Sequence, residues 1–165
     1  MTTITIHFDM DGTIADLYGI DNWLEMLIAS NTYPYENAKP LLRLSALAKR
    51  LNNLQAQGYQ IGIISWLSKS GTDEYNERVA QVKREWLAKH LPSVNWDSIN
   101  IVPYGTPKSN FATTPCDILF DDEERNRKEW TGRAFDVDNI LGVLATLGTF
   151  EDKIHNLYLM HHIGG

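Results

Sequence analysis

The chain has 165 residues, of which 43% are hydrophobic, and this is enough for one compact domain with an ordinary core. A formal net charge of −6 argues against general binding to nucleic acid, because affinity for a phosphate backbone comes from clustered Lys and Arg. The only cysteine, Cys116, excludes an intramolecular disulfide, and no apolar run approaches the length of a membrane span, so we expect a cytoplasmic protein with no membrane segment.

The first predicted element is a strand that ends in an acidic turn. Residues 4–8 alternate apolar and polar side chains and run into the cluster DMDGT at residues 9–13. The next segment, residues 14–40, does not fit the pattern of the rest of the chain and contains several aromatic side chains.

Helices and strands then alternate. Leucines at helical spacing over residues 41–54, followed by Gly58 as a stop, predict a helix that leads into a buried strand at 61–64. An amphipathic stretch centred on residues 79–87 predicts a second helix, which leads to a strand at 99–102.

The last third continues the same alternation. It predicts strands at 118–120 and 134–137 and a helix at 140–147, followed by a helical tail over residues 149–165. Strands that alternate with helices indicate βαβ units, so we expect a single α/β domain over residues 1–165 with a mainly parallel sheet flanked by helices. The tail could pack on this domain or on a second subunit, and a homo-oligomer stays open.

Polar residues follow four of the predicted strands. In parallel α/β sheets, ligands bind at the carboxyl ends of the strands, so these residues are expected to share one site. In chain order they are Asp9 and Asp11, Ser65, Lys108, and Asp121 with Asp122.

The acidic members of this set favour a divalent metal. Asp9 and Asp11 are two residues apart on an extended segment, so their side chains point to the same side and repel each other. A bound cation removes that repulsion, and oxygen ligands with room for water and phosphate suit Mg²⁺, with Asp121 completing the carboxylates.

The same set supplies what phosphoryl transfer needs. A carboxylate can form an acyl phosphate, the hydroxyl of Ser65 can donate to a phosphoryl oxygen, and Lys108 can neutralise charge there. Taken singly, Ser65 is also a typical turn or cap hydroxyl and Lys108 a typical solvated loop lysine, so these alternatives stay open.

Four segments in this order resemble the motifs of the haloacid dehalogenase (HAD) superfamily. They are IHFDMDGTIAD, IGIISW, PKSNF and ILFDDEERN. The resemblance runs from about residue 4 to residue 144. It implies a Rossmann-like HAD fold, with residues 14–40 forming a reduced helical cap after the first strand.

The resemblance also implies roles for the residues of the motifs. Asp9 is expected to be the nucleophile that carries the phosphoryl group, and Asp11 the acid and base. The implied Mg²⁺ ligands are the Asp9 side chain, the Asp11 backbone carbonyl and Asp121, supported by Asp122.

The remaining implied positions surround the substrate. Ser65 and Lys108 would hold the phosphoryl group, and Gly12, Thr13 and Trp66 would border the substrate. An aspartate two residues after the nucleophile is typical of phosphatases, whereas haloalkanoic acid dehalogenases generally lack it.

Within the superfamily the chain is most similar to the 5'(3')-deoxyribonucleotidase group, on the segments KREWLAKHLP and DDEERNRKEWTGRAF. The implied substrate is therefore a nucleotide or another small phosphorylated metabolite. Aromatic residues of the second motif and the reduced cap could stack a base: Trp66, Tyr18, Trp23, Tyr33 and Tyr35. The reduced cap departs from the family pattern. It leaves open a binding module that holds its ligand without rapid turnover, or a phosphatase acting on polynucleotide ends.

Overall fold

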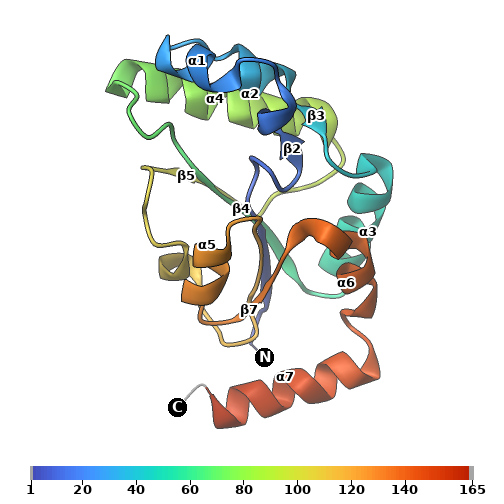
Figure 1. Cartoon of the computed structure of the whole chain (residues 1–165). Coiled ribbons are helices and arrows are strands. Elements are labelled where there is room, and N and C mark those ends of the chain that lie inside the picture. The colour runs from blue at the N-terminus through green and yellow to red at the C-terminus, as the bar shows by residue number, and fades with distance from the viewer. Residues whose placement is uncertain (1, 164–165) are drawn as a thin grey trace.

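The central feature of the computed structural model is a five-stranded parallel sheet (Figure 1). The structure describes residues 2–163, so Met1 and the last two residues of the predicted tail lie outside the described part. The strands of this sheet are β1 (Thr5–Phe8), β4 (Gln60–Trp66), β5 (Ser98–Val102), β6 (Ile118–Phe120) and β7 (Arg133–Phe135).

The strand order is β5-β4-β1-β6-β7, and every neighbouring pair is parallel. Numbered along the chain within the sheet, this is the order 3-2-1-4-5 of a doubly wound Rossmann-like sheet. The direction of winding reverses at β1, which lies between β4 and β6. A crevice for a ligand is expected at the carboxyl end of β1.

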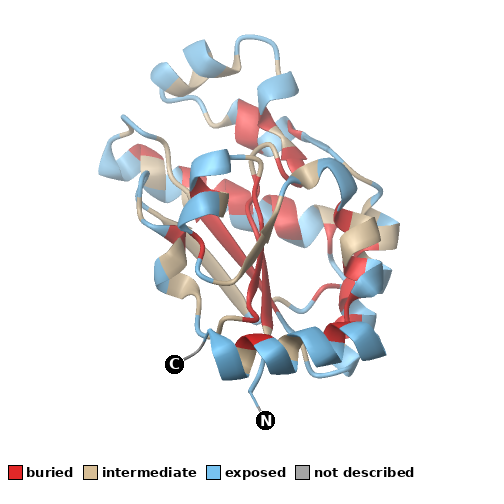
Figure 2. Cartoon of the chain, turned by 60° about the horizontal axis from the view of Figure 1, so that its bottom comes forward, coloured by how far each residue is buried: buried red, intermediate tan, exposed pale blue. Residues whose placement is uncertain are grey.

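Alternating side chains divide the sheet into two faces. On one face, Ile6 and Phe8 of β1 join Ile61, Ile63, Ile118 and Phe120 in the main core. On this face pack the helices α3 (Leu44–Ala56), α6 (Ile140–Thr146) and the second half of α4 (Asp73–His90). The opposite face carries a smaller cluster around Leu119 and Trp130, next to η2 (Lys108–Phe111) and α5 (Glu124–Glu129). Buried residues lie in the central strands and in parts of the surrounding helices (Figure 2).

The insert after β1 forms a small helical layer of its own. It contains η1 (Leu17–Gly19), α1 (Trp23–Ile28) and α2 (Tyr33–Asn37). Two short strands, β2 (Ala15–Asp16) and β3 (Lys39–Pro40), pair antiparallel and join its two ends. Residues 14–40 therefore form a closed helical unit, called the insert below; that it acts as a reduced cap stays a prediction.

Helix α4 connects the insert to the sheet. Its N-terminal half contributes Tyr75, Val79 and Val82 to a cluster with Leu17 and Tyr35 of the insert. Its C-terminal half contributes Trp86 and Leu87 to the main core. In Figure 1, α4 lies beside α1 and α2 at one end of the molecule.

The C-terminal helix α7 (Phe150–His162) lies at the opposite end of the molecule from the insert (Figure 1). Asp152 fixes it to the body, because its carboxylate accepts hydrogen bonds from Arg133 Nη1 at 2.8 Å and Tyr59 Oη at 3.1 Å. Leu159 is also buried. The tail thus packs on the body; pairing with a second subunit stays a prediction. No helix among residues 2–163 has both the length and the apolar character needed to cross a membrane.

The predicted strands and long helices are confirmed, with small differences at their ends. The helix predicted over 41–54 spans Leu44–Ala56, and β7, predicted over 134–137, spans Arg133–Phe135. The chain turns at Asp136, whose carboxylate accepts a hydrogen bond from the Val137 N–H at 2.7 Å and begins the short helix η3 (Val137–Asn139). A local cap therefore ends the strand before Val137 can extend it.

Candidate active site

The acidic turn after β1 is held by backbone hydrogen bonds. The Asp9 N–H donates to the carbonyl of Phe120 at 2.9 Å, which joins the ends of β1 and β6. The next residues fold back, because the N–H groups of residues 13, 14 and 15 all lie within 3.1 Å of the Met10 carbonyl oxygen. This tight turn fixes where the Asp9 and Asp11 side chains begin.

Gly12 is required at this turn for two reasons. Its φ is +78°, in the left-handed region that side chains with a Cβ disfavour. A Cβ built at this position would also clash with the carboxylate of Asp122 and lie 2.8 Å from Cε2 of Tyr18. The glycine therefore allows the ends of β1 and β6 to approach each other.

Lys108 binds two carboxylates at the base of the site. Its Nζ lies 2.9 Å from Asp9 Oδ1 and 2.7 Å from Asp121 Oδ2, and its side chain is only 2% exposed. Burial alone would lower the pKa of Lys108, but the charges of Asp9 and Asp121 raise it to about 12. The lysine is therefore a permanent cation next to Asp9.

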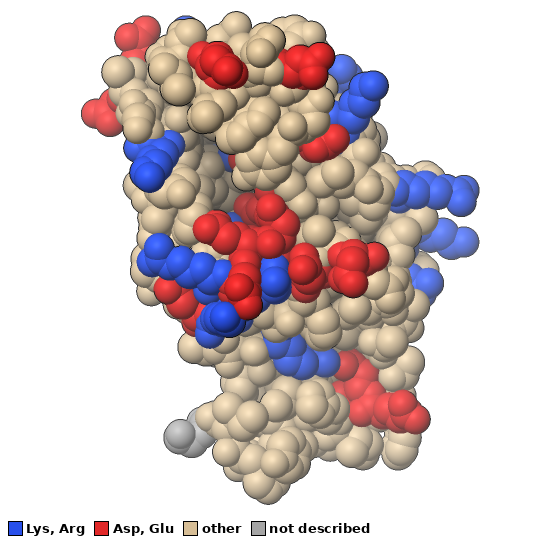
Figure 3. Space-filling model, viewed as in Figure 1, with Lys and Arg blue, Asp and Glu red and all other residues tan. Residues whose placement is uncertain are grey.

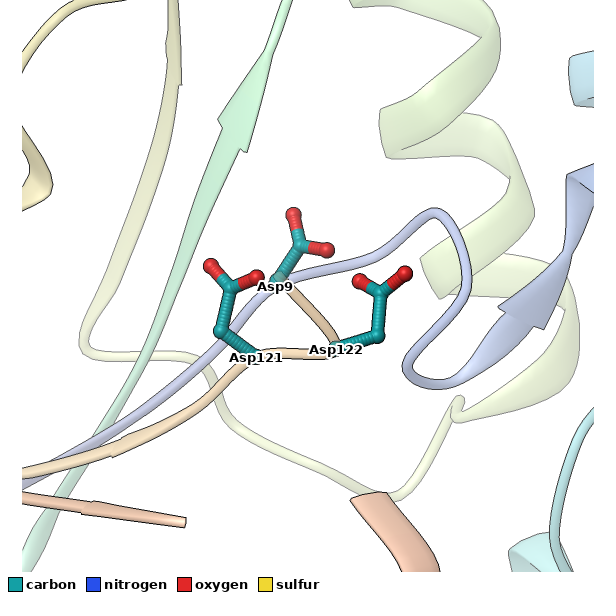
Figure 4. A group of neighbouring side chains, drawn as sticks. All are labelled: Asp9, Asp121 and Asp122. Atoms are coloured by element: carbon teal, nitrogen blue, oxygen red, sulfur yellow. The ribbon is translucent and has the colours of Figure 1, made fainter. Parts of the chain in front are cut away.

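Three carboxylates converge beside this lysine (Figure 4). Asp9, Asp121 and Asp122 each offer an oxygen, and the three oxygens lie within 4.8 Å of one another. Burial and the neighbouring charge of Asp9 raise the pKa of Asp121 to about 6 and that of Asp122 to about 7. A set of crowded carboxylate oxygens is the donor set that a hard divalent cation prefers, so these residues could hold one.

Neighbouring groups orient the carboxylates. The Thr13 hydroxyl lies 3.2 Å from Asp9 Oδ2 and 3.4 Å from Asp122 Oδ1. Asn126 Nδ2 donates to Asp121 Oδ2 at 3.1 Å. Such contacts fix the direction of oxygens that bind a cation.

Asp11 lies outside this group and pairs with a different lysine. Lys83 of α4 donates to Asp11 Oδ2 at 2.7 Å, and also to Ser65 Oγ at 2.8 Å. Burial raises the pKa of Asp11, while the charge of Lys83 opposes this rise. Lys83 thus joins the end of β1 to the end of β4.

A cleft of about 920 Å³ opens above these groups, between the sheet and the insert. Figure 3 shows acidic side chains gathered around a hollow on this face, and Asp122, Glu123 and Glu124 line the cleft there. About half of the residues that line the cleft are apolar or aromatic. They include two aromatic pairs with ring centroids 4.9 Å apart, Trp66 with Tyr104 and Tyr18 with Trp23.

The indole of Trp66 is fixed, because its Nε1 donates to the carbonyl of Thr106 at 2.9 Å. Tyr18 and Tyr104 are about half exposed. These rings present faces on which a flat group could stack. Tyr33, in contrast, is not among the residues that line the cleft.

Most of the predicted site residues meet at one edge of the sheet, whereas Gly12 and Thr13 do not line the cleft and border a separate hollow beside residues 137–141. Asp9, Asp11, Trp66, Lys108 and Asp122 line the cleft. Ser65 and Asp121 lie directly behind them through their bonds to the two lysines. The individual roles in catalysis, substrate binding and metal binding stay predictions.

Two residues of the site were missed from the sequence. Lys83 falls at helical spacing among Val79, Val82 and Trp86, and a lysine on the apolar side of an amphipathic helix was the signal. Tyr104 follows β5 by two residues, so the rule about strand ends that selected Ser65 applies to it as well.

Comparisons with known proteins give limited similarity. No family model matches this sequence, and no curated protein matches it. Among solved structures, the chain is similar to D,D-heptose 1,7-bisphosphate phosphatase from Burkholderia thailandensis, at 14% identity, with 94% of this chain and 84% of that chain covered and a TM-score of 0.46. It is also similar to D,D-heptose 1,7-bisphosphate phosphatase from B. bronchiseptica, complexed with magnesium and phosphate, at 14% identity, with 91% and 90% covered and a TM-score of 0.48. The fold assignment therefore depends on the strand order and register of the chain itself.

Proposed function

We propose that this chain is a Mg²⁺-dependent phosphomonoesterase of the HAD superfamily that acts through an aspartyl phosphate on Asp9. The observation that carries the proposal is the pairing of Asp9 with a buried cation at the switch point of a Rossmann-like sheet. The proposed substrate is a nucleoside monophosphate or a similar small phosphorylated metabolite.

Asp9 is suited to attack phosphorus. Its carboxylate lines the cleft and is held by Lys108 and Thr13, so one oxygen can approach the phosphoryl group in a fixed direction. Lys108 uses two of its three donors on carboxylates and has one left for a phosphoryl oxygen. The ammonium would then neutralise charge that develops on that oxygen.

Asp9, Asp121 and Asp122 are the residues whose carboxylates would hold Mg²⁺, together with the backbone carbonyl of Asp11. When bound, Mg²⁺ would supply charge neutralisation to the phosphoryl oxygens. The fit is good, because the three carboxylate oxygens lie within 4.8 Å of one another and only two of the three carboxylates, Asp9 and Asp121, are paired with Lys108.

Asp11 is the proposed acid and base. As an oxygen of Asp9 bonds to phosphorus, the bond from phosphorus to the ester oxygen breaks, and Asp11 gives its proton to the leaving alkoxide. Asp11 then takes a proton from the water that attacks the acyl phosphate. The bond between Asp9 and phosphorus breaks, and inorganic phosphate leaves.

The walls of the cleft support a substrate with a flat organic part. Trp66, Tyr104 and Tyr18 offer aromatic faces, which contribute about 1–3 kcal/mol per stacked base in single-strand binding proteins. The acidic rim at Glu123 and Glu124 disfavours a second phosphate group near the mouth. A monophosphate with an aromatic group fits both features.

The test is release of inorganic phosphate from a panel of nucleoside 5'- and 3'-monophosphates and sugar phosphates, with Mg²⁺ or with a chelator. Asp9→Asn is the blank. Asp21→Asn is the matched control, because Asp21 is exposed and does not line the cleft. We expect release that the chelator and Asp9→Asn each abolish and that Asp21→Asn leaves unchanged.

Two results would contradict the proposal. Release of phosphate that persists in Asp9→Asn would refute the assignment of Asp9 as the nucleophile. No release from any ester by a folded sample, with a nucleotide recovered unchanged after binding in calorimetry, would replace the enzyme by a binding module.

A further inference from the structure

Lys83 is a buried cation that lies behind the proposed catalytic groups. It is 1% exposed and does not line the cleft. Burying a lysine is costly unless its charge is paired and its donors are satisfied, so its contacts should reveal its role.

All three donors of this ammonium are used. They reach Asp11 Oδ2 at 2.7 Å, Ser65 Oγ at 2.8 Å and the Trp66 carbonyl oxygen at 2.7 Å. A lysine has three N–H donors and no acceptor. No donor is left for a substrate oxygen, in contrast to Lys108.

The insert also contacts the ammonium. The Tyr35 ring centroid lies 4.9 Å from Lys83 Nζ, within the range of a cation–π contact, and Tyr35 is buried against α4. The ammonium is thus enclosed by the end of β4, the turn after β1 and the insert. Its position is fixed from every side.

These contacts orient two proposed catalytic side chains, Asp11 and Ser65. The bond to Asp11 fixes one oxygen of a carboxylate that would otherwise rotate about its side-chain bonds. The bond to Ser65 uses the hydroxyl oxygen as an acceptor, so the single hydrogen of Ser65 stays free to donate to another acceptor.

We infer that Lys83 is a positioning residue that holds Asp11 in place to protonate the leaving group. This inference rests on the proposed function, since it assigns a support to the proposed acid. Without the ammonium, Asp9 can still attack phosphorus, but the proton needed by a poor leaving group is no longer delivered in the right place.

The readout is the dependence of kcat/KM on the leaving group. This constant reports the steps up to formation of the aspartyl phosphate. In Lys83→Met, we expect kcat/KM for an alkyl phosphate to fall by about 100-fold or more, the range of general acid catalysis. For p-nitrophenyl phosphate, whose leaving phenolate is stable without a proton, we expect a fall of less than about tenfold.

A double-mutant cycle identifies the partner. Asp11→Asn should show the same preference for the aryl ester, and Lys83→Met added to Asp11→Asn should cost little more than Asp11→Asn alone, because the two residues act as a unit. Lys89→Met is the matched control, since Lys89 is an exposed lysine of the same helix. If Lys83→Met does not fold, Lys83→Gln takes its place.

The outcomes separate this inference from the proposed function. An equal loss for alkyl and aryl esters, or effects of Lys83 and Asp11 that add, would overturn the inference while wild-type turnover still supports the enzyme. Failure of both Lys83 variants to fold would assign the residue to the fold and overturn it too. A wild-type protein without Asp9-dependent release would refute the proposed function first, and this inference with it.

Discussion

His7 is a buried titratable residue that predicts how stability depends on pH. It lies in β1, between Gly62 of β4 and Leu119 of β6, and is 4% exposed. Neither ring nitrogen has a hydrogen-bond partner among residues 2–163, and the ring packs edge-on against Trp130 at 5.5 Å between centroids. A protonated ring here would be a buried charge. The folded state therefore favours the neutral form.

The pKa of His7 sets the size of this pH-dependent change in stability. Burial lowers the pKa of His7 from 6.5 to about 4, although the charge of Asp117 opposes this shift. At 1.36 kcal/mol per pKa unit, the difference corresponds to about 3 kcal/mol. The unfolded state binds more protons between these two values, so stability is full above about pH 6.5 and falls as the pH is lowered toward about 4.

The assay is urea denaturation at about pH 7.5 and at about pH 4.5, for the wild type and for His7→Leu. The variant lacks the titrating ring. Between the higher and the lower pH, its free energy of unfolding should therefore fall by about 2.5 kcal/mol less than that of the wild type. His155→Leu is the matched control, because His155 is exposed. Its free energy of unfolding should fall by as much as that of the wild type. Equal losses in the wild type and His7→Leu would refute the reasoning.

Three further changes test the site and its supports. Lys108→Met removes the cation shared by two buried carboxylates. We therefore expect its free energy of unfolding, measured in urea with chelator, to fall by about 3 kcal/mol and to recover when Mg²⁺ is added. An unchanged free energy of unfolding in chelator would contradict the pairing. Gly12→Ala places a side chain at a positive φ and against Asp122. We therefore expect its free energy of unfolding in the same assay to fall by about 1–3 kcal/mol and its phosphate release to slow. Wild-type stability and wild-type release would show that the turn can relax. Asp152→Ala leaves the Arg133 guanidinium without its carboxylate and weakens the attachment of α7. We therefore expect the free energy of unfolding to fall by about 3 kcal/mol, while the folded protein releases phosphate at an unchanged rate. Slower phosphate release would show that α7 affects the site.

The order of strands and helices could be predicted because it depends on local patterns. The strand at 61–64 is an apolar run long enough to be a buried strand, and the helix at 41–54 shows its leucines at the helical period. Neither pattern says which strands are neighbours. The position of β1 between β4 and β6 is set by long-range pairing, such as Phe8 with Ile63 and Phe120, which periodicity does not contain.

The same limit explains what was missed in the site. Asp9 and Asp121 could be found because each directly follows a strand, and strand ends meet at one edge of the sheet. Lys83 comes from the middle of a helix and is 72 residues from Asp11 in the chain. Its place beside Asp11 depends on how α4 lies across the end of the sheet, which is a property of packing between elements.

The charges of the site, taken together, explain why a phosphate ester would need a metal to enter it. Two buried lysines each pair with at least one carboxylate, so neither ammonium is free to attract an anion from a distance. With every carboxylate ionised, the formal charges of these groups sum to −2; with Asp11 carrying the proton of its proposed role as acid, they sum to −1. A phosphate dianion approaching the metal-free site would therefore meet net repulsion in a partly buried cleft, where charges are weakly screened. Binding of the cation and of the phosphate should consequently be coupled under the proposed function. The carboxylates and lysines concerned are Asp9, Asp11, Asp121, Asp122, Lys83 and Lys108.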